Sequence, residues 1–180
     1  MVYMFLADGF EEIEALYTLD VLRRAGIDIK TVGVGGKTAT GSHQIPVACD
    51  VTADEISPDS EFDMIILPGG MPGSTNLDKS EVVDHFISVA NENGKFICAI
   101  CAAPFVLGKR GILKGKRATC YPGFEAELMG ATLVDAGCVR DGSIITARAM
   151  GSAHEFAFEI LGALTDDNMV QKIKKAILLD

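Results

Sequence analysis

Short apolar segments alternate with longer helical patterns along most of the chain. Strands buried in a sheet are predicted by the continuous apolar character of Val2–Leu6, Ile29–Val34, Met64–Leu67 and Phe96–Ile100. Helices are predicted by the apolar spacing of Glu11–Arg24, Glu81–Asn91, Ala103–Arg110, Ala153–Leu164 and Asn168–Leu179. In the first of these helices, we expect the buried face to carry Ile13, Leu16, Tyr17 and Val21.

The remaining segments are less regular. Gly35–Val51 contains Gly, Ser and Pro without a helical period, which predicts a hairpin excursion at an edge of the sheet. Ala118–Cys120 predicts a short strand, and Phe124–Leu128 predicts a short helix. Thr132–Ala147 predicts two strands joined at Asp141-Gly142, a pair that is frequent in hairpin turns.

Strand and helix alternation of this kind predicts an α/β fold, with a mostly parallel sheet and helices on both faces. No linker, repeat or low-complexity tract interrupts the pattern, so we expect residues 1–180 to form a single domain. In such folds, ligands bind beyond the carboxyl ends of the strands, where the strand order reverses. Candidate functional residues are therefore expected just after the predicted strands.

Composition and charge exclude several classes of function. The 16 Lys and Arg residues against 25 Asp and Glu residues give a net charge of −9, which repels a phosphate backbone and argues against nucleic acid as a main partner. The longest apolar run, Phe96–Leu107, is shorter than the ~20 residues of a membrane span, and the N-terminus lacks the basic start of a signal peptide. We expect a cytoplasmic protein without a membrane segment, whose five cysteines are mostly reduced.

Two segments of the chain resemble common motifs, a phosphate-binding loop and a redox cysteine pair, without meeting their requirements. Gly33–Thr38 resembles the end of a phosphate-binding loop, but Thr31 stands where that motif needs its first Gly. Cys98 and Cys101 have the spacing of a redox pair, but three strand residues separate Cα atoms by about 10 Å, beyond the ~7 Å that a disulfide tolerates. We expect no disulfide between them, and we interpret Cys98 as a small core residue.

Cys101 is different, because a predicted strand ends and a predicted helix begins around it. Small residues flank it on both sides, and Pro104 suits the first turn of a helix. A sharp turn at this point lifts the side chain above the sheet edge, as in a nucleophile elbow. The positive end of the helix favours the reactive thiolate. We interpret Cys101 as a nucleophile, with a buried and inert thiol as the alternative.

Three carboxylates, Glu11, Glu12 and Glu14, open the first predicted helix. Acidic residues complement the positive end of a helix, and this explains two of the three. The same helix starts at the carboxyl end of a strand, so one carboxyl is within reach of Cys101. A thiolate beside a carboxyl requires that carboxyl to hold a proton and donate a hydrogen bond.

Backbone amides at two strand ends complete the candidate site. Pro68–Gly73 follows a predicted strand, and its glycines let a ligand approach the backbone closely. The N–H groups of Gly70 and Ala102 are candidates for an oxyanion site, although a plain tight turn also explains the glycines. Metal-ligand spacing with the cysteines is lacking for His43, His85 and His154. We therefore expect no metal site.

Five segments together resemble the ThiJ/PfpI superfamily and, within it, the DJ-one-like branch. They are Asp8–Glu14, Leu22–Gly26, Asp63–Gly70, Ala99–Pro104 and Ala153–Leu164. The resemblance covers essentially the whole chain and implies a flavodoxin-like three-layer sandwich that forms a homodimer. It also implies that Cys101 is the nucleophile and Glu14 the protonated carboxyl beside it. Gly70 and Ala102 match the positions whose backbone amides face the cysteine.

The superfamily includes enzymes and stress proteins. The resemblance implies, without a cofactor, conversion of methylglyoxal to lactate or removal of early glycation adducts from proteins. Ala102 stands where peptidase-like members carry His, so an intracellular peptidase is the weaker interpretation. Tyr121 stands where glyoxalase members carry His, and a phenol can donate a proton but is a poor base at neutral pH. Cys120 is either a second thiol at the site or a core residue.

Two functions of different classes use the same residues. In the first, Cys101 adds to a small 2-oxoaldehyde or its adduct, Glu14 moves protons, and the two amides hold the oxyanion. In the second, the protein is a redox sensor or stress chaperone, in which Cys101 is oxidised to a sulfinate that Glu14 stabilises. We favour the enzyme, because oxyanion amides have no clear purpose in a sensor.

Overall fold

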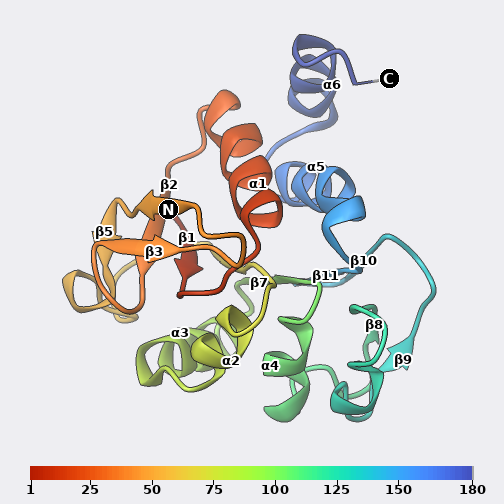
Figure 1. Ribbon diagram of the computed structural model, residues 1–180. Helices are drawn as coiled ribbons and strands as arrows, with labels where there is room; N and C mark the ends of the chain where they lie inside the picture. Colours follow the sequence, from red (N-terminus) through yellow and green to blue (C-terminus); the bar gives the residue numbers. More distant parts are fainter. Residues whose placement is uncertain (180) are drawn as a thin grey trace.

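The computed structural model describes residues 1–179 and is built around one seven-stranded sheet (Figure 1). Its strands are β1 (Val2–Leu6), β2 (Ile29–Gly33), β5 (Val51–Thr52), β6 (Met64–Leu67), β7 (Phe96–Ile100), β10 (Cys138–Asp141) and β11 (Ile144–Ala147). They lie in the order β10-β11-β7-β6-β1-β2-β5. Only β10 is antiparallel to its neighbour in this sheet, so the predicted mostly parallel sheet is confirmed.

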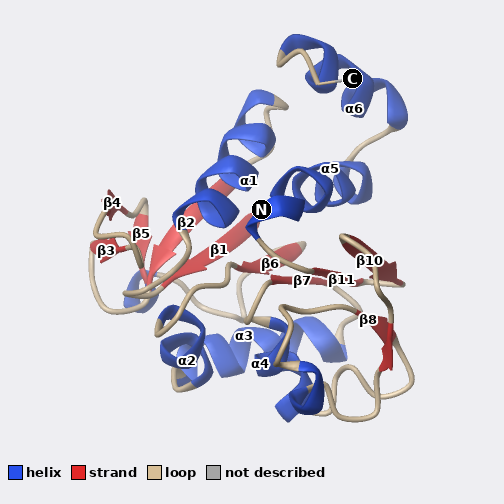
Figure 2. Ribbon diagram, turned by 45° about the vertical axis from the view of Figure 1, so that its right-hand side comes forward, coloured by secondary structure: helices blue, strands red, loops and turns tan. Residues whose placement is uncertain are grey.

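Helices cover both faces of the sheet (Figure 2). One face carries α1 (Glu12–Arg24) and α5 (Ala153–Leu164), with α6 (Asp167–Ala176) packed on α5. The other carries α2 (Gly73–Asp78), α3 (Glu81–Glu92) and α4 (Pro104–Lys109). This is the predicted three-layer, flavodoxin-like α/β fold. Among residues 1–179, no helix combines the length and the apolar character that crossing a membrane requires.

Two small sheets flank the main one. The predicted hairpin excursion is confirmed: β3 (Thr38–Thr40) and β4 (Pro46–Ala48) pair antiparallel beside the β2 and β5 end of the main sheet. At the other end, β8 (Arg117–Ala118) and β9 (Thr132–Leu133) pair in parallel. Single turns of 3-10 helix occur at Ala53–Glu55, Glu125–Glu127 and Met150–Ser152.

The expected short elements differ most from the structure. The strand expected at Ala118–Cys120 ends at Ala118, because the next N–H, that of Thr119, donates to the side-chain oxygen of Thr146 at 3.0 Å rather than to another strand. The helix expected at Phe124–Leu128 is reduced to a 3-10 turn. Helix α2 was not predicted, because the Gly and Pro residues before it indicate a turn.

Alternate residues of β1 contribute to two separate hydrophobic cores. Val2, Met4 and Leu6 pack in the core that includes α1 and α5. Tyr3 and Phe5 pack in the core that includes α3. Burial of both faces explains why the central strands are apolar throughout rather than alternating between apolar and polar.

The buried face of α1 agrees only in part with the one predicted from apolar spacing. Ile13 exposes 49% of its surface, so its predicted burial is wrong. Leu16 and Tyr17 are half-buried and pack against the core that includes α1 and α5, in agreement with their predicted inward side. Val21 is buried as predicted, and it shares the buried face with Glu14. Apolar spacing alone assigns Ile13 to the buried face. It does so wrongly because a carboxyl, that of Glu14, occupies one of the buried positions in the first turn.

The strand order reverses between β1 and β6. The chain passes from β1 to β2 and β5 on one side, then returns to β6 and β7 on the other. Ligand sites of open α/β sheets lie at the carboxyl ends of strands around such a reversal. The segments that follow β1, β6 and β7 therefore hold the candidate site.

Candidate active site

Cys101 lies at a sharp turn directly after β7. Its backbone is in the left-handed region, with φ 65°, which L-residues other than Asn and Asp rarely adopt. The Cys101 N–H still donates to the carbonyl of Ala147 at 2.9 Å, so the turn starts at the last hydrogen bond of the sheet. Ala102 and Ala103 are buried behind it, and α4 begins at Pro104. The backbone thus forms the strand-to-helix elbow predicted at this cysteine.

Gly69, the residue after Pro68 at the end of β6, lets Cys101 and Glu14 come together. A Cβ atom added at Gly69 would lie 2.5 Å from the Cys101 Cβ and 2.5 Å from Oε2 of Glu14. Real Cβ atoms do not come that close to other atoms, so only glycine fits at position 69 without displacing its neighbours. Sequence reasoning chose Gly70 and missed Gly69, although both belong to the same Pro-Gly-Gly segment.

Glu14 is nearly completely buried, with 1% of its surface exposed. Its Oε2 accepts the N–H of Gly69 at 2.9 Å, while Oε1 is buried without a hydrogen-bond partner among residues 1–179. Burial raises the pKa of this carboxyl to about 7, helped by the negative charge of Glu11 and opposed by the Cys101 thiol and the Gly69 N–H. Glu14 therefore exchanges its proton near neutral pH.

The Cys101 thiol is less acidic than its position before a helix suggests. Burial and the charge of Glu14 raise its pKa to about 12. The N–H groups of Ala102 and Gly70 lower the pKa, but by less than burial and Glu14 raise it. The expected preference for a thiolate is thus wrong while Glu14 is ionised. When Glu14 takes a proton, its repulsion of a thiolate disappears, and the two groups share one proton.

Backbone amides surround the sulfur of Cys101. The N–H groups of Gly70 and Ala102 lie close enough to lower the thiol pKa, against the larger effects of burial and Glu14. Gly70 has φ 89°, a conformation that glycine adopts without strain. The structure therefore brings together Cys101, Glu14, Gly70 and Ala102, as expected from the sequence.

Tyr121 is attached to the elbow through its backbone. Its N–H donates to the carbonyl of Cys101 at 2.8 Å, and its side chain is 47% exposed. Cys120 is buried, and burial raises its thiol pKa to about 11. All five cysteines are free, which agrees with the prediction that Cys98 and Cys101 form no disulfide.

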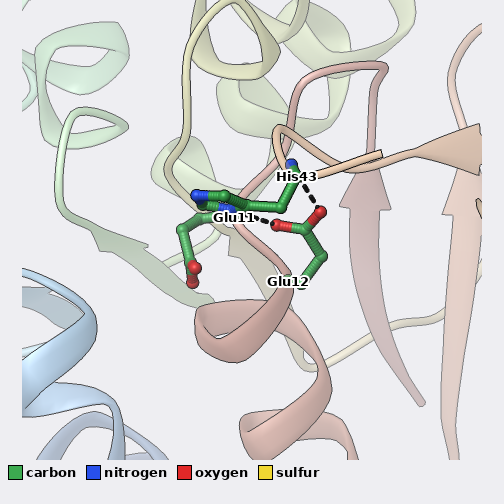
Figure 3. Close-up of side chains that lie close together, drawn as sticks. All are labelled: Glu11, Glu12 and His43. Carbon is green, nitrogen blue, oxygen red and sulfur yellow. Dashed lines mark hydrogen bonds and ion pairs between the residues drawn. The ribbon is translucent and has the colours of Figure 1, made fainter. Parts of the chain in front are cut away.

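A pairing between α1 and the β3–β4 hairpin was not predicted (Figure 3). Glu12 is 3% exposed. Its Oε1 accepts the backbone N–H of His43 at 2.7 Å, and its Oε2 lies 2.9 Å from Nδ1 of the imidazole. The two residues are 31 positions apart, and no local motif links them. Glu12 therefore joins the start of α1 to the hairpin, in addition to complementing the positive end of the helix.

Glu11 completes this group. As the N-cap of α1, it accepts the N–H of Glu14 at 2.8 Å, a role that fits the expected stabilisation of the helix start. One oxygen of Glu11, one of Glu12 and one ring nitrogen of His43 lie within 4.8 Å of one another. Both oxygens of Glu12 are already engaged by His43, so the group is a carboxylate–imidazole pair beside a second carboxylate.

The fold and the site together define a class: flavodoxin-like α/β proteins with a cysteine at the elbow after a central strand and a buried carboxyl beside it. The chain belongs to the DJ-1/PfpI family, whose family model matches residues 1–163. This confirms the superfamily predicted from the sequence.

Individual relatives agree with the DJ-1-like branch. Protein dj-1beta of Drosophila melanogaster is 37% identical over 179 residues, which are 98% of this chain and 95% of that protein. The crystal structure of Drosophila melanogaster DJ-1beta matches with a TM-score of 0.95 at 36% identity, covering 99% of this chain and 97% of that chain. Deglycase PH1704 of Pyrococcus horikoshii is 32% identical over 171 residues, which are 91% of this chain and 99% of that protein.

Proposed function

We propose that this protein is a cysteine-dependent, cofactor-independent enzyme that acts on 2-oxoaldehydes such as methylglyoxal, or on their glycation adducts, during carbonyl or oxidative stress. One observation carries the proposal: the buried Glu14 carboxyl, with its pKa raised to about 7, lies beside the Cys101 thiol. A carboxyl of this kind accepts and donates protons equally well at neutral pH. Cys101 supplies the nucleophile, and Glu14 moves its proton.

The first step is addition of the thiol to an aldehyde. The sulfur of Cys101 forms a bond to the aldehyde carbon, and the thiol proton passes through Glu14 to the aldehyde oxygen. Because the thiol pKa is about 12 while Glu14 is charged, the sulfur becomes strongly nucleophilic only as Glu14 takes the proton. The product is a hemithioacetal on Cys101.

The backbone amides of Gly70 and Ala102 suit the charge that develops during this addition. The aldehyde oxygen gains negative charge as the carbon–sulfur bond forms, and N–H donors fixed by the backbone stabilise it without reorganising. The Tyr121 N–H is bonded to the Cys101 carbonyl and the residue is half exposed, and we infer that its phenol contacts substrate or donates a proton.

Names of relatives support the hydrolytic form of this activity. Two archaeal relatives, from Pyrococcus abyssi and Pyrococcus horikoshii, are named deglycases and are 31% and 32% identical to this chain. A glycation adduct carries the carbon skeleton of the 2-oxoaldehyde, so the same cysteine and carboxyl serve both substrates. Attack of Cys101 on an adduct releases the amine or thiol that carried it and leaves the same hemithioacetal on the cysteine. Transfer of hydrogen from its first carbon to the neighbouring ketone carbon turns it into a thioester, which water hydrolyses to lactate and the free thiol.

The test is lactate formation from methylglyoxal, with release of free amine from a glycated peptide measured in parallel. We expect wild type to form product and Cys101→Ser to lose at least 100-fold in rate, since the nucleophile is removed. Cys138→Ser is the matched control, because Cys138 is partly buried in β10 and is not part of the site. Equal rates for wild type and Cys101→Ser would overturn the proposal.

A second candidate function is redox sensing. Cys101 is partly exposed, and Oε1 of Glu14 is free to hydrogen-bond an oxidised sulfur. One solved relative, 30% identical with a TM-score of 0.93, is described as oxidised DJ-1 of Toxoplasma gondii. Intact mass after mild peroxide separates the two functions: a sensor gains two oxygens on Cys101 before any other cysteine reacts.

We also propose a cytoplasmic homodimer. Large apolar side chains that are about half exposed support the dimer: Ile13, Met71 and Met150. Ile13 lies on α1, and the other two follow β6 and β11, the strands on either side of β7. A second copy of this chain would cover such residues at the carboxyl edge of the sheet.

A further inference from the structure

The proposed reaction on methylglyoxal requires two kinds of proton transfer, and this inference rests on that proposed function. After Cys101 has added to the aldehyde, one hydrogen must move from the former aldehyde carbon to the neighbouring carbon. A second proton must move between the two oxygens on those carbons. One carboxyl can carry these two protons only in turn, so a second acid–base group beside Glu14 would let both transfers proceed together.

The Glu12–His43 pair has the construction of such a group. The carboxylate of Glu12 is buried and fixes Nδ1 of the imidazole at 2.9 Å, while the side chain of His43 is 73% exposed. Figure 3 shows the ring lying over Glu11, with one nitrogen toward Glu12 and the other on the side of the ring away from Glu12. A buried carboxylate that orients an imidazole in this way sets its tautomer and stabilises its protonated form.

The position of the pair links it to the Cys101 site through Glu11. On one side, the carboxylate of Glu11 lies with His43 and Glu12 within 4.8 Å. On the other, it caps the N–H of Glu14 at 2.8 Å, and its N–H donates to the carbonyl of Gly69 at 2.9 Å. Gly69 is the residue packed against Cys101. His43 thus stands at the same end of α1 as the proposed catalytic carboxyl.

The hairpin that carries His43 is held firmly over this helix end. A Cβ atom at Gly41 would lie 2.2 Å from Oε1 of Glu12, so Glu12 packs directly against the hairpin backbone. The N–H of Ser42 donates to the carbonyl of Phe10 at 2.7 Å. These contacts hold the hairpin backbone that carries His43 at the N-terminal end of α1.

We propose that His43, oriented by Glu12, is a second acid–base catalyst of the Cys101 site and moves the proton between the substrate oxygens while Glu14 moves the proton between the carbons. Imidazolium His43 donates its proton to the ketone oxygen as ionised Glu14 removes the hydrogen of the former aldehyde carbon. Glu14 then returns that proton to the second carbon, and neutral His43 takes the hydroxyl proton from the first. A thioester on Cys101 results, and water hydrolyses it to lactate and the free thiol.

The charges around His43 favour its starting state. The hydrogen bond and charge of Glu12, with the charge of Glu11, raise the pKa of the imidazole. These two residues of α1 are the titratable groups that face it among residues 1–179. A raised imidazole pKa favours the imidazolium, which is the form of His43 that the step requires.

The experiment is the pH profile of lactate formation by wild type, His43→Gln and Glu12→Gln, with His85→Gln on α3 as the matched histidine control. We expect His43→Gln to lose about 100-fold and to recover part of the loss with added imidazole, because the ring site is exposed. Glu12→Gln should move the high-pH limb of the profile to lower pH, since the imidazole loses its stabilising charge. Imidazole rescue is a response that a hairpin anchor alone cannot produce.

The outcomes separate this inference from the function on which it rests. If wild type forms no lactate, the proposed function is wrong. If wild type is active and His43→Gln retains its rate and pH profile, the role of His43 is wrong while the function stands. A loss in His43→Gln that imidazole does not restore and that leaves the pH profile unchanged also overturns the inference, because it marks an anchoring role only.

Discussion

Glu14 on α1 and Gly69 after β6 are joined by a hydrogen bond of 2.9 Å from the Gly69 N–H to Oε2 of Glu14, across 55 positions of sequence. This bond fixes one oxygen of the buried carboxyl, while the other has no hydrogen-bond partner within residues 1–179. Gly69 also leaves room for the Cys101 side chain. One backbone position therefore sets the geometry of both groups of the proposed reaction.

Substitution of Gly69 should disrupt the site by crowding. In Gly69→Ala, the new Cβ would lie 2.5 Å from the Cys101 Cβ and from the Glu14 carboxylate, so one of them must shift. We expect a loss of about 1–3 kcal/mol in the free energy of unfolding and a loss of activity. Urea unfolding measures the first effect. Gly35→Ala is the control, because a Cβ there meets nothing within 4 Å, and a Gly69→Ala variant as stable as this control would contradict the packing described.

Stability should depend on pH through Glu14. Its pKa rises from the usual 4.5 to about 7 on folding, so between these values the folded state binds more protons than the unfolded state. The contribution of Glu14 to stability is therefore present below about pH 4.5 and is lost as pH rises toward 7. Relative to Glu14→Gln, wild type should lose up to about 3 kcal/mol over this range.

Paired urea titrations of wild type and Glu14→Gln at several pH values measure this difference. The Gln side chain still offers an oxygen to the Gly69 N–H, so the packing is preserved. A stability difference that stays constant from pH 4.5 to 7 would show that Glu14 does not titrate in this range.

The acidity of Cys101 should respond to the same substitution. Burial raises the Cys101 pKa to about 12 and the charge of Glu14 contributes to the rise, so Glu14→Gln should lower this pKa. We expect iodoacetamide to alkylate Cys101 several-fold faster in Glu14→Gln than in wild type at pH 8. Cys138, whose pKa is raised by burial and by Glu159 and Glu155, serves as the internal control in the same digest. An unchanged alkylation rate at Cys101 would show that Glu14 does not affect the pKa of the thiol.

Assembly should depend on the exposed face of α1. Ile13 is 49% exposed, and a glutamate there would place a charge in the proposed contact between copies. We expect light scattering to find a dimer for wild type and a monomer for Ile13→Glu. Leu178→Glu is the control, because Leu178 is 90% exposed near the end of the chain. Finding the wild type as a monomer at micromolar concentration would contradict the proposed homodimer.

Much of the fold could be predicted because the central strands are buried on both faces. Val2–Leu6 and Phe96–Ile100 are apolar at every position and match β1 and β7 at both ends. The elbow at Cys101 was also accessible, since small residues and Pro104 indicate a tight turn into a helix. The apolar runs and the small residues around Cys101 are features of neighbouring positions, and a single sequence shows such local features directly.

The rest depends on contacts between distant segments. No residue near Glu12 in the sequence indicates that its carboxylate pairs with His43 of the hairpin. Acidic residues at a helix start are usually explained by the positive end of the helix alone. Likewise, Ile13 is apolar yet exposed, because the buried carboxyl of Glu14 takes a position on the inner face of α1. Only the packing of α1 against the strand ends decides these cases.

The most direct test of the account is the rate of lactate formation from methylglyoxal by wild type and Glu14→Gln, measured side by side at pH 7. Glu14 carries the proton of Cys101 and of the substrate carbon in the proposed mechanism, so Glu14→Gln should be slower by about 100-fold or more while remaining folded. Equal rates in a folded Glu14→Gln variant would contradict it.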